Sequence, residues 1–399
     1  MPIIQSLLDS DLYKFFMCQI IFHRYTSASA EYIYKLRNDD IHFTEQMYNK
    51  IQEEIDELCN LKYTDKELTY LYSTGYFKKD FIEFLGMFKL NRKHLDVKLV
   101  DGKLDIHIKG SWLYIMMFEI YLMEIISEVY FNAIEIVKNT YNIIGNDNIN
   151  EKITQITIYN HECKYECIDK KFLKLADFGG RRRRSFSWHD HIVGKLKTHL
   201  PLNFVGTSNV YMAMKHKIKP IGTMAHEYIM AFQALGCRLI NSQRVALEMW
   251  AKEYRGNLGI ALTDTINMDA FLNDFDLYYC KLFDGCRHDS GDPYVWCNKL
   301  IAHYKKLGID PTTKTAVFSD GLNITKAIAI HREFKNQINV SFGIGTNLTN
   351  DVGLIPLNHV IKIIKCNDQD VAKISDSSGK TVCTNDSYVT YLKSVFGVV

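Results

Sequence analysis

The sequence predicts an α/β protein whose central part forms either a β/α barrel or a doubly wound sheet. From about residue 170 onward, a short apolar run, a glycine-bearing or polar motif and a helical segment follow one another repeatedly. Seven such units recur at spacings of roughly 20 to 35 residues, which is typical of parallel strands joined by helices. The two ends of the chain instead carry β-rich pieces with polar turns, which indicates a second, smaller domain.

The composition excludes binding that is driven by overall charge. The chain has 399 residues, 47% of them hydrophobic and 24% charged, so it is long enough for a large barrel with additions or for two domains. Lysine and arginine number 48 against 46 aspartates and glutamates, which gives a formal net charge of +2. Such a balance creates no field that would attract DNA or a membrane, so any anion binding must come from local clusters.

Three features bear on the compartment. The ten cysteines form no CxxC pair, and "HECKYEC" (His161, Cys163, Cys167) has no second ligand pair for zinc, so we expect reduced thiols in a cytoplasmic protein. The N-terminus has no basic segment followed by an apolar core, so we expect no secretory signal. The apolar stretch 112–131 is interrupted by three glutamates, which predicts a long, mostly buried helix and not a membrane span.

The elements near the two ends of the chain follow from their patterns. Residues 42–59 place apolar side chains at helical spacing, and residues 97–112 alternate around an Asp-Gly turn, as in a β-hairpin. Residues 359–376 consist of an apolar strand, a polar turn and a second strand. By contrast, residues 136–170 are polar and carry no recognisable motif.

These patterns predict two domains. We expect residues 1–130, joined by residues 355–399, to form an N-terminal α/β domain. We expect residues 131–354 to form the β/α barrel.

The chemistry-bearing motifs lie after the predicted central strands. They are FGGR, GTSN, GTMAHE, LTDT, RHDSGDP, FSDG and FGIGT. In a barrel and in a doubly wound sheet alike, such motifs lie at the carboxyl edge, where ligands bind. Glycines let backbone N–H groups approach phosphate, arginine binds phosphate bidentately, and aspartate holds ribose hydroxyls or Mg²⁺. This inventory suits a phosphorylated sugar with a pyrophosphate and a metal, and the four arginines at 181–184 are placed for a small anion.

The motifs together resemble those of the nicotinate phosphoribosyltransferases, which are type II phosphoribosyltransferases. The resemblance runs from about residue 5 to residue 385 through SLLDSDLYK, DFGGRRR, GTSN, IGTMAHE, ALTDT, RHDSGDP, SFGIGT and VAKISDSSGKTVC. It implies an irregular β/α barrel packed on a smaller α/β domain built from both chain ends. The implied reaction joins nicotinate to phosphoribosyl pyrophosphate, giving nicotinate mononucleotide and pyrophosphate in NAD salvage, with ATP hydrolysis coupled through a phosphohistidine.

The resemblance also implies partners and a location. Mg²⁺ would be the cofactor and ATP the coupled co-substrate, with no direct protein ligand assigned to the metal. We expect a cytoplasmic homodimer whose active site is shared across subunits, and no nucleic-acid or membrane partner.

Roles for the nicotinate pocket and the phosphorylated residue follow from the same resemblance. His226 matches the phosphorylated histidine, and the alternative is a hydrogen-bonded structural histidine. Glu227 would either orient the His226 ring or cap the next helix. Arg181 matches the arginine that meets the pyridine carboxylate and a neighbouring phosphate. Phe178 and, from the partner subunit, Tyr13 would stack on the two faces of the pyridine. The alternative for both rings is ordinary core packing. Gly179, next to Phe178, would also bind substrate.

Three further positions bear on specificity. Ser208 stands where nicotinamide-using relatives place an aspartate, and its neutral side chain removes a repulsion of the acid. Gly180 stands where relatives often carry threonine. Alternate members of the run Arg182–Arg184 would face opposite sides, so that one or two assist with phosphate and the rest are solvated.

The remaining matches concern phosphoribosyl pyrophosphate. Arg287 and Asp289 would grip it, with Asp292 assisting through metal or a hydroxyl. Contacts to ribose, metal or the 5′-phosphate are expected from Asp264, Asp320, Gly343, Gly345 and Thr346. For each aspartate the alternative is an N-cap of the following helix.

Three other functions stay open. A nicotinamide phosphoribosyltransferase would use the same scaffold. A sugar-phosphate aldolase or isomerase barrel would need a Schiff-base lysine or a paired acid and base, and the strand-end motifs offer no lysine. A nucleic-acid binder would use the run Arg181–Arg184.

Overall fold

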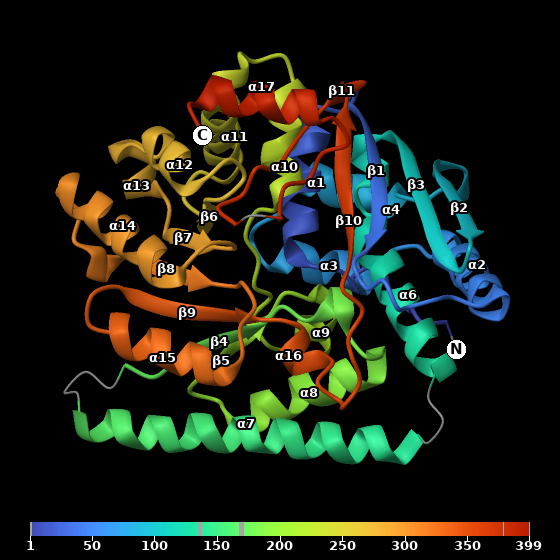
Figure 1. Cartoon of the computed structure of the whole chain (residues 1–399), viewed down its shortest axis with the longest axis horizontal. Helices are drawn as coiled ribbons and strands as arrows, with labels where there is room; N and C mark the ends of the chain where they lie inside the picture. The colour runs from blue at the N-terminus through green and yellow to red at the C-terminus, as the bar shows by residue number, and fades with distance from the viewer. Residues whose placement is uncertain (1, 135–137, 167–170, 378, 399) are drawn as a thin grey trace.

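The computed structural model describes residues 2–134, 138–166, 171–377 and 379–398, which form two sheets with helices around them (Figure 1). A six-stranded parallel sheet lies in one half of the molecule and a five-stranded antiparallel sheet in the other. The architecture is therefore α/β with two separate sheets, as predicted.

The parallel sheet is built from the middle of the chain. Its order is β5-β4-β9-β8-β7-β6, and each of its neighbouring strands is parallel. The strands are short and mostly buried, which is expected where helices cover a parallel sheet. Their bounds are β4 Lys174–Asp177, β5 Phe204–Thr207, β6 Ile260–Leu262, β7 Gly285–His288, β8 Thr315–Phe318 and β9 Asn339–Ile344.

One of the seven predicted strand units is wrong. The segment that leads to GTMAHE forms no strand, and it pairs with β5 only through an isolated bridge between Thr207 and Pro220. Proline has no N–H to donate to a ladder, which limits pairing there. The segment lies so close to β5 that a Cβ on Gly206 would come within 2.1 Å of the Lys219 carbonyl oxygen.

The helices associated with the parallel sheet begin where their strand-end motifs finish. Asn209, Asn267, Asp292 and Asn323 cap four of them, each side chain accepting from a backbone N–H of the first turn. The helices are α8 Phe186–His199, α9 Val210–His216, α10 His226–Ala231, α11 Ser242–Tyr254, α12 Met268–Asp274, α13 Leu277–Leu282, α14 Pro293–Lys306, α15 Ile324–Phe334 and α16 Thr346–Thr349. Short 3₁₀ turns occur at Arg92–His94 (η1), Gly180–Arg182 (η2), Phe232–Ala234 (η3), Leu239–Asn241 (η4) and Pro311–Thr313 (η5).

The antiparallel sheet combines both ends of the chain, as predicted. Its order is β11-β10-β1-β3-β2, with β1 Ser29–Leu36, β2 Leu95–Val100, β3 Lys103–Ser111, β10 His359–Cys366 and β11 Gln369–Asp370. The predicted hairpin turns at Asp101 and Gly102, whose φ angles of 49° and 74° suit this tight connection.

The second strand of the C-terminal piece is shorter than expected. β11 has two residues, and the chain then leaves the antiparallel sheet. The Ile374 N–H donates to the Thr265 carbonyl just after β6, at 2.8 Å. The tail therefore crosses to the carboxyl edge of the parallel sheet.

The remaining helices cover the N-terminal half and the outside of the molecule. They are α1 Leu12–Arg24, α2 Glu45–Asn60, α3 Asp65–Ser73, α4 Lys79–Met87, α5 Trp112–Ile115, α6 Phe118–Ile134, α7 Lys138–Glu166 and α17 Asp386–Phe396. The predicted buried helix over 112–131 is α5 and α6, interrupted after Ile115. Among the described residues, no helix has the length and apolarity needed to cross a membrane.

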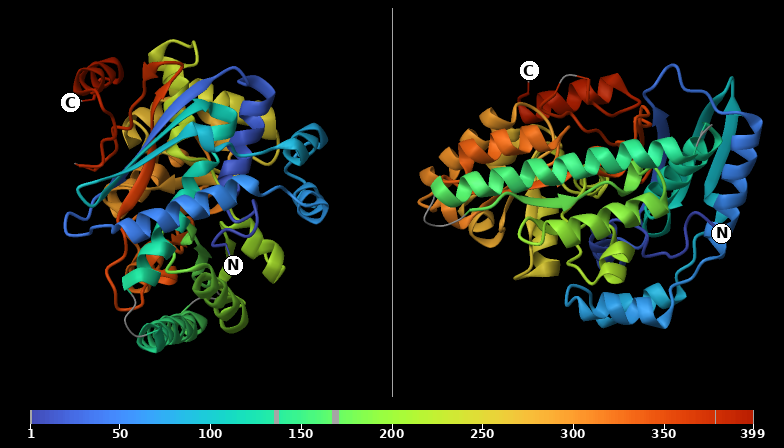
Figure 2. Two further views of the ribbon diagram at one scale, coloured as in Figure 1. Left: turned by 90° about the vertical axis from the view of Figure 1, so that its right-hand side faces the viewer. Right: turned by 90° about the horizontal axis from the view of Figure 1, so that it is seen from below.

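The polar segment without a motif is largely the single helix α7. It lies along one side of the molecule beside α8 and α15 (Figures 1 and 2). Ile149, Ile156 and Tyr159 are buried on its inner side. Cys163 also lies on α7 and is a free thiol, whereas Cys167 of the predicted "HECKYEC" cluster lies outside the described residues.

A short N-terminal segment joins the two halves. The Leu12 N–H donates to the Ser208 carbonyl at 2.8 Å, and the Val210 N–H donates to the Ser10 carbonyl at 2.9 Å. Just before them in the chain, the buried Asp9 accepts two hydrogen bonds from the Arg183 guanidinium, at 2.7 and 2.8 Å. Residues 8–12 are therefore fixed to the end of β5 and to the chain after η2.

We expect Arg183→Met to lower the free energy of unfolding by about 3–5 kcal/mol, because it leaves buried Asp9 without its cation. Urea denaturation measures this change. Arg332→Met is the matched control, since the ion pair of Arg332 with Glu162 is exposed and its loss should cost under about 1 kcal/mol. Equal costs for the two variants would contradict a structural role for the buried pair.

Candidate active site

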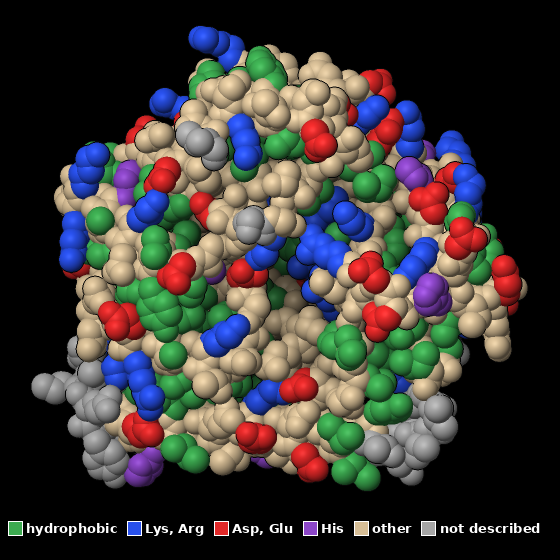
Figure 3. Space-filling model, in the orientation of Figure 1, with side chains coloured by type: hydrophobic (Ala, Val, Ile, Leu, Met, Phe, Trp, Pro, Cys, Tyr) green, Lys and Arg blue, Asp and Glu red, His purple; other side chains and the backbone are tan. Residues whose placement is uncertain are grey.

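A cavity of about 420 Å³ opens where the carboxyl edge of the parallel sheet faces β10 and the C-terminal tail. Figure 3 shows this face hollowed near its centre, with Lys and Arg side chains gathered beside the hollow. Most of the predicted site residues line the cavity: Tyr13, Phe178, Gly179, Arg181, His226, Arg287, Asp289, Asp320, Gly343, Gly345 and Thr346. Asp264 and Ser208, which were also predicted, lie outside its lining.

Phe178 takes its position from the strands on either side of it. It follows β4, and its N–H donates to the Ile344 carbonyl of β9 at 2.9 Å. Its ring lies on Gly343, where a Cβ would come within 2.2 Å of two ring carbons. A Cβ on Gly345 would likewise be 3.0 Å from the Phe178 carbonyl oxygen. Both glycines therefore make room for Phe178, and their expected contact with a 5′-phosphate stays a prediction.

Tyr13 lines the cavity of its own chain, which differs from the expectation that a partner subunit supplies it. The cause is the N-terminal segment just before it, because the backbone hydrogen bonds of Ser10 and Leu12 fix that segment to the end of β5. Tyr13 follows directly in the first turn of α1. A single chain thus brings Tyr13 and Phe178 to one cavity.

The four consecutive arginines divide into two pairs. Arg181 and Arg182 lie in η2 and line the cavity. Arg181 is 43% exposed, and its Nη1 lies 3.9 Å from Glu119 Oε1. The Arg182 guanidinium donates to the His359 carbonyl at 3.0 and 3.2 Å, which holds this side chain against β10.

The other two arginines were expected to assist with phosphate or to be solvated, and both are instead buried. Arg183 pairs with Asp9, and its Nη1 lies 3.3 Å from Glu124 Oε1. Arg184 lies over the Phe131 ring at 5.7 Å and donates to Asn132 Oδ1 at 3.1 Å. Both therefore serve the packing between α6 and the chain after η2.

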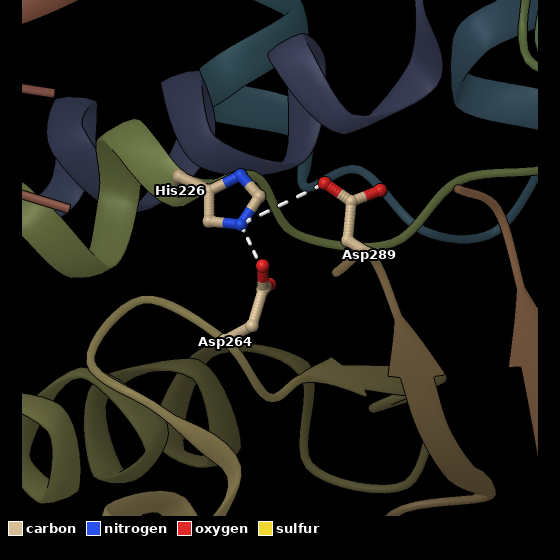
Figure 4. A group of neighbouring side chains, drawn as sticks. All are labelled: His226, Asp264 and Asp289. Atoms are coloured by element: carbon tan, nitrogen blue, oxygen red, sulfur yellow. Dashed lines mark hydrogen bonds and ion pairs between the residues drawn. The ribbon is translucent and has the colours of Figure 1, made fainter. Parts of the chain in front are cut away.

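His226 is the first residue of α10 and lies between two aspartates (Figure 4). Its Nε2 is 2.7 Å from Asp264 Oδ1 and 3.8 Å from Asp289 Oδ2. The other oxygen of Asp264 accepts from Ser290 Oγ at 2.6 Å and from Lys373 Nζ at 2.7 Å. Asp264 thus lies behind the histidine and positions it, which differs from its expected contact with substrate.

These contacts determine which nitrogen of His226 carries the proton. Burial and the Lys373 ammonium lower the pKa of His226 to about 4, although Asp264 opposes this shift. Burial alone would raise the pKa of Asp264, but His226 and Lys373 hold it well below its ordinary value. A neutral ring that faces a carboxylate donates from Nε2, which leaves a lone pair on Nδ1.

Arg287 and Asp289 extend the site from the end of β7. Arg287 donates from Nη2 to the Met224 carbonyl at 3.0 Å, and its Nη1 is 3.5 Å from Asp289 Oδ1. Asp289 also accepts from Ser319 Oγ at 2.9 Å. Asp292 instead caps α14 through the N–H groups of its first turn, at 2.9 Å, and lies outside the cavity lining.

Several cations of the cavity come from the antiparallel sheet and the tail, and the strand-end motifs did not reveal them. They are Arg37, Lys362, Lys373 and Lys380. Lys380 Nζ is 2.6 Å from Asp320 Oδ1, and burial lowers the pKa of Lys362 to about 8, although Glu119 opposes that shift. The motif VAKISDSSGKTVC contains Lys373 and Lys380, so a signal for these two was present. Arg37 and Lys362 have no comparable motif.

The prediction that Ser208 contacts the substrate is not supported by its position. Its hydroxyl is buried and donates to Asp11 Oδ1 at 2.6 Å, and its N–H donates to the Asp177 carbonyl. Asp177 was not predicted, yet it accepts from Thr207, His189 and the Gly179 N–H. These buried bonds shape the turn that presents Phe178 and the glycines to the cavity.

Glu227 takes neither of its two expected roles directly. Its carboxylate accepts a hydrogen bond from the buried Lys14 ammonium and lies in the first turn of α10. Among the described contacts, Glu227 makes none with the His226 ring, and its side chain does not cap α10.

A divalent cation fits this site only in part. His226, Asp264 and Asp289 place one ligand atom each within 4.8 Å of one another. Asp264 is already engaged by His226, Ser290 and Lys373, and Mg²⁺ prefers oxygen ligands and retains several waters. Asp289 and Asp320 line the cavity, so a hydrated Mg²⁺ that is also held by ligand phosphates would meet these two carboxylates, in competition with Lys380 at Asp320.

Comparisons with known proteins agree over the whole chain. The model of the nicotinate phosphoribosyltransferase (NAPRTase) family matches residues 173–399, and that of the NAPRTase N-terminal domain matches residues 8–127. Nicotinate phosphoribosyltransferases from Acinetobacter baumannii and Chromobacterium violaceum are 49% and 48% identical to it, covering 100% of this chain and 98% of each relative.

Solved structures give the same result. The crystal structure of nicotinate phosphoribosyltransferase from Vibrio cholerae aligns with a TM-score of 0.92 at 36% identity, covering 100% of this chain and 94% of that one. A putative nicotinate phosphoribosyltransferase from Saccharomyces cerevisiae aligns with a TM-score of 0.90 at 30% identity, covering 100% and 99%. The cavity, the two sheets around it and these likenesses lead to one conclusion: the chain belongs to the nicotinate phosphoribosyltransferase family.

Proposed function

We propose that this protein transfers the phosphoribosyl group of phosphoribosyl pyrophosphate to nicotinate, and that ATP hydrolysis is coupled to the transfer through phosphorylation of His226. The product would be nicotinate mononucleotide, which serves NAD salvage. The observation that carries the proposal is the single cavity that holds Phe178, Tyr13, Arg181 and His226 together with a group of cations.

The cavity has the parts that a flat acid requires. The Phe178 and Tyr13 rings would enclose the pyridine, and such stacking buries the ring and limits its orientation. The partly exposed Arg181 guanidinium would bind the carboxylate bidentately. An amide in place of that carboxylate would lose the charge-assisted bonds, which favours nicotinate over nicotinamide. Since the Ser208 hydroxyl is engaged by Asp11, its contribution would be indirect.

The cations suit a polyanionic donor. Arg287, Lys362 and Lys380 line the cavity beside the aspartates, and their charges would bind the phosphates of phosphoribosyl pyrophosphate. Mg²⁺, when bound, would neutralise charge on the pyrophosphate leaving group, with Asp289 and Asp320 holding its hydration shell.

Transfer itself needs positioning more than proton movement. The bond between ribose C1 and the pyrophosphate oxygen breaks, and the pyridine nitrogen bonds to C1 through an oxocarbenium-like transition state. That nitrogen is unprotonated near neutral pH, so no general base is required. Arg287 and the lysines would stabilise the departing pyrophosphate, while the two aromatic rings align the attacking nitrogen.

The geometry around His226 suits phosphorylation by ATP. Asp264 accepts a hydrogen bond from Nε2–H, so the Nδ1 lone pair is the nucleophile that would attack the γ-phosphorus. The bond between this phosphorus and the ADP oxygen breaks as the bond to Nδ1 forms, and ADP leaves. Water later cleaves the phosphorus–nitrogen bond, which releases phosphate and restores the neutral ring.

A cytoplasmic homodimer stays a prediction from the family resemblance. Because Tyr13 lines the cavity of its own chain, one chain brings both predicted ring contacts. We therefore do not expect activity to depend on association of two chains.

We expect pyrophosphate release with nicotinate to exceed that with nicotinamide by about 100-fold in kcat/KM, because only the acid pairs with Arg181. Assays with each base, with and without ATP, measure this ratio. Arg181→Met should reduce the preference to near 1. Arg332→Met should leave it unchanged, because Arg332 is an exposed residue of α15 that lies outside the cavity lining. Faster turnover of the amide would contradict the proposal.

We expect His226→Ala to abolish both phosphohistidine formation and the effect of ATP on transfer, because the nucleophilic Nδ1 is lost. Mass spectrometry after incubation with ATP detects the modification, and the pyrophosphate assay detects the stimulation. His216→Ala is the control, since His216 pairs with Asp190 outside the cavity lining. An undiminished ATP effect in His226→Ala would refute the phosphohistidine.

A further inference from the structure

The reaction described above assigns no role to the buried ammonium of Lys14. Lys14, on α1, is fully buried, and its ammonium is shared between two carboxylates. Its Nζ lies 2.6 Å from Glu119 Oε2 of α6 and also donates to Glu227 Oε1 of α10. Lys14 is absent from the cavity lining, so it does not reach substrate.

Each carboxylate beside Lys14 adjoins a different part of the active site. Glu227 directly follows His226 in the first turn of α10. Glu119 faces Arg181, with 3.9 Å between its Oε1 and Arg181 Nη1. Lys14 itself directly follows Tyr13 in the chain. One ammonium thus connects the start of the His226 helix with the two residues expected to hold nicotinate.

We propose that Lys14 is a positioning residue through which phosphorylation of His226 changes the orientation of Arg181. This inference rests on the phosphohistidine of the proposed function. Lys14 would have no contact with substrate, and its effect would pass through the two glutamates.

The physical basis is a balance of buried charges. Two carboxylates compete for one ammonium in surroundings of low dielectric, where each interaction is stronger than in water. A phosphoryl group on His226 would add up to two negative charges one residue before Glu227, at the start of the same helix. The ammonium would then shift toward Glu227 and weaken its bond to Glu119.

A weaker bond to Lys14 leaves Glu119 free to approach Arg181. The present separation of 3.9 Å exceeds hydrogen-bonding distance, so a short movement would create a charge-assisted bond. Glu119 would then hold the Arg181 guanidinium in one orientation before nicotinate arrives. Preorganisation of this kind raises affinity because less conformational freedom is lost on binding.

A purely structural role for Lys14 makes a different prediction. If the ion pairs only stabilise the packing of α1, α6 and α10, their loss would lower stability and leave the response to ATP unchanged. The deciding quantity is therefore the ratio of kcat/KM for nicotinate with ATP to the same value without ATP, measured beside the extent of His226 phosphorylation.

We expect Lys14→Met to be phosphorylated by ATP and to have this ratio reduced about tenfold, toward 1, relative to the unmodified sequence. Lys314→Met is the matched control, because Lys314 is also buried but donates to the Phe283 carbonyl at 2.7 Å. Lys314 directly precedes β8, at the end of this strand opposite its carboxyl edge. The control should keep the full ratio. An unchanged ratio in phosphorylated Lys14→Met would overturn the inference.

Glu227→Gln decides the question if Lys14→Met does not fold, since it keeps an acceptor for Lys14 and removes the charge. The same loss of stimulation with intact phosphorylation is expected, and an unchanged ratio would again overturn the inference. Absence of phosphohistidine in the unmodified protein would refute the proposed coupling and this inference together. Phosphorylation with normal stimulation in both variants would refute the inference alone.

Discussion

The buried ion pair between Asp9 and Arg183 fixes the place where the two halves of the molecule meet. Its bidentate geometry, together with the backbone bonds of residues 8–12 to the end of β5, allows only one arrangement of the N-terminal segment. Tyr13 and Lys14 follow directly, so the place of Tyr13 in the cavity wall and the bond of Lys14 to Glu227 depend on this joint. An active site assembled from both sheets requires such a fixed contact, because an error of an ångström would separate its parts.

The same joint explains the division of the four arginines. After β4 the chain makes one 3₁₀ turn, in which Arg181 and Arg182 lie on the cavity side. The next residue, Arg183, points into the core because Asp9 and Glu124 are there to receive it. Four identical residues thus have two different environments: two line the cavity, and two are buried in internal contacts. The difference is set by partners that lie more than 50 residues away in the chain.

The division of the arginines shows which features of the site could be predicted from the sequence and which could not. Arg287 and Phe178 lie at the carboxyl ends of parallel strands, which meet at one edge, and both line the cavity; His226 lines it too, although the segment before it forms no strand. Local pattern could not reveal burial of Arg183, which depends on Asp9, nor the cavity position of Lys362, which β10 brings across. Ser208 was misjudged for a related reason: its motif gave its place after a strand, while Asp11 determined where its hydroxyl points. Long-range pairing, and not local conformation, separates the predicted residues that line the cavity from those that do not.

The electrostatics of the cavity follow from the need to accept a polyanion. Asp264 accepts a hydrogen bond from His226 and Glu119 lies near Arg181, yet unpaired negative charge in the cavity would repel phosphates. Lysines partly balance these carboxylates: Lys373 pairs with Asp264, and Lys14 is shared by Glu119 and Glu227. Arg181, Arg287 and Lys362 line the cavity itself. Because every neutralising lysine lies on an element remote in sequence from its carboxylate, the charge balance exists only once both halves have assembled, which ties anion binding to the completed fold.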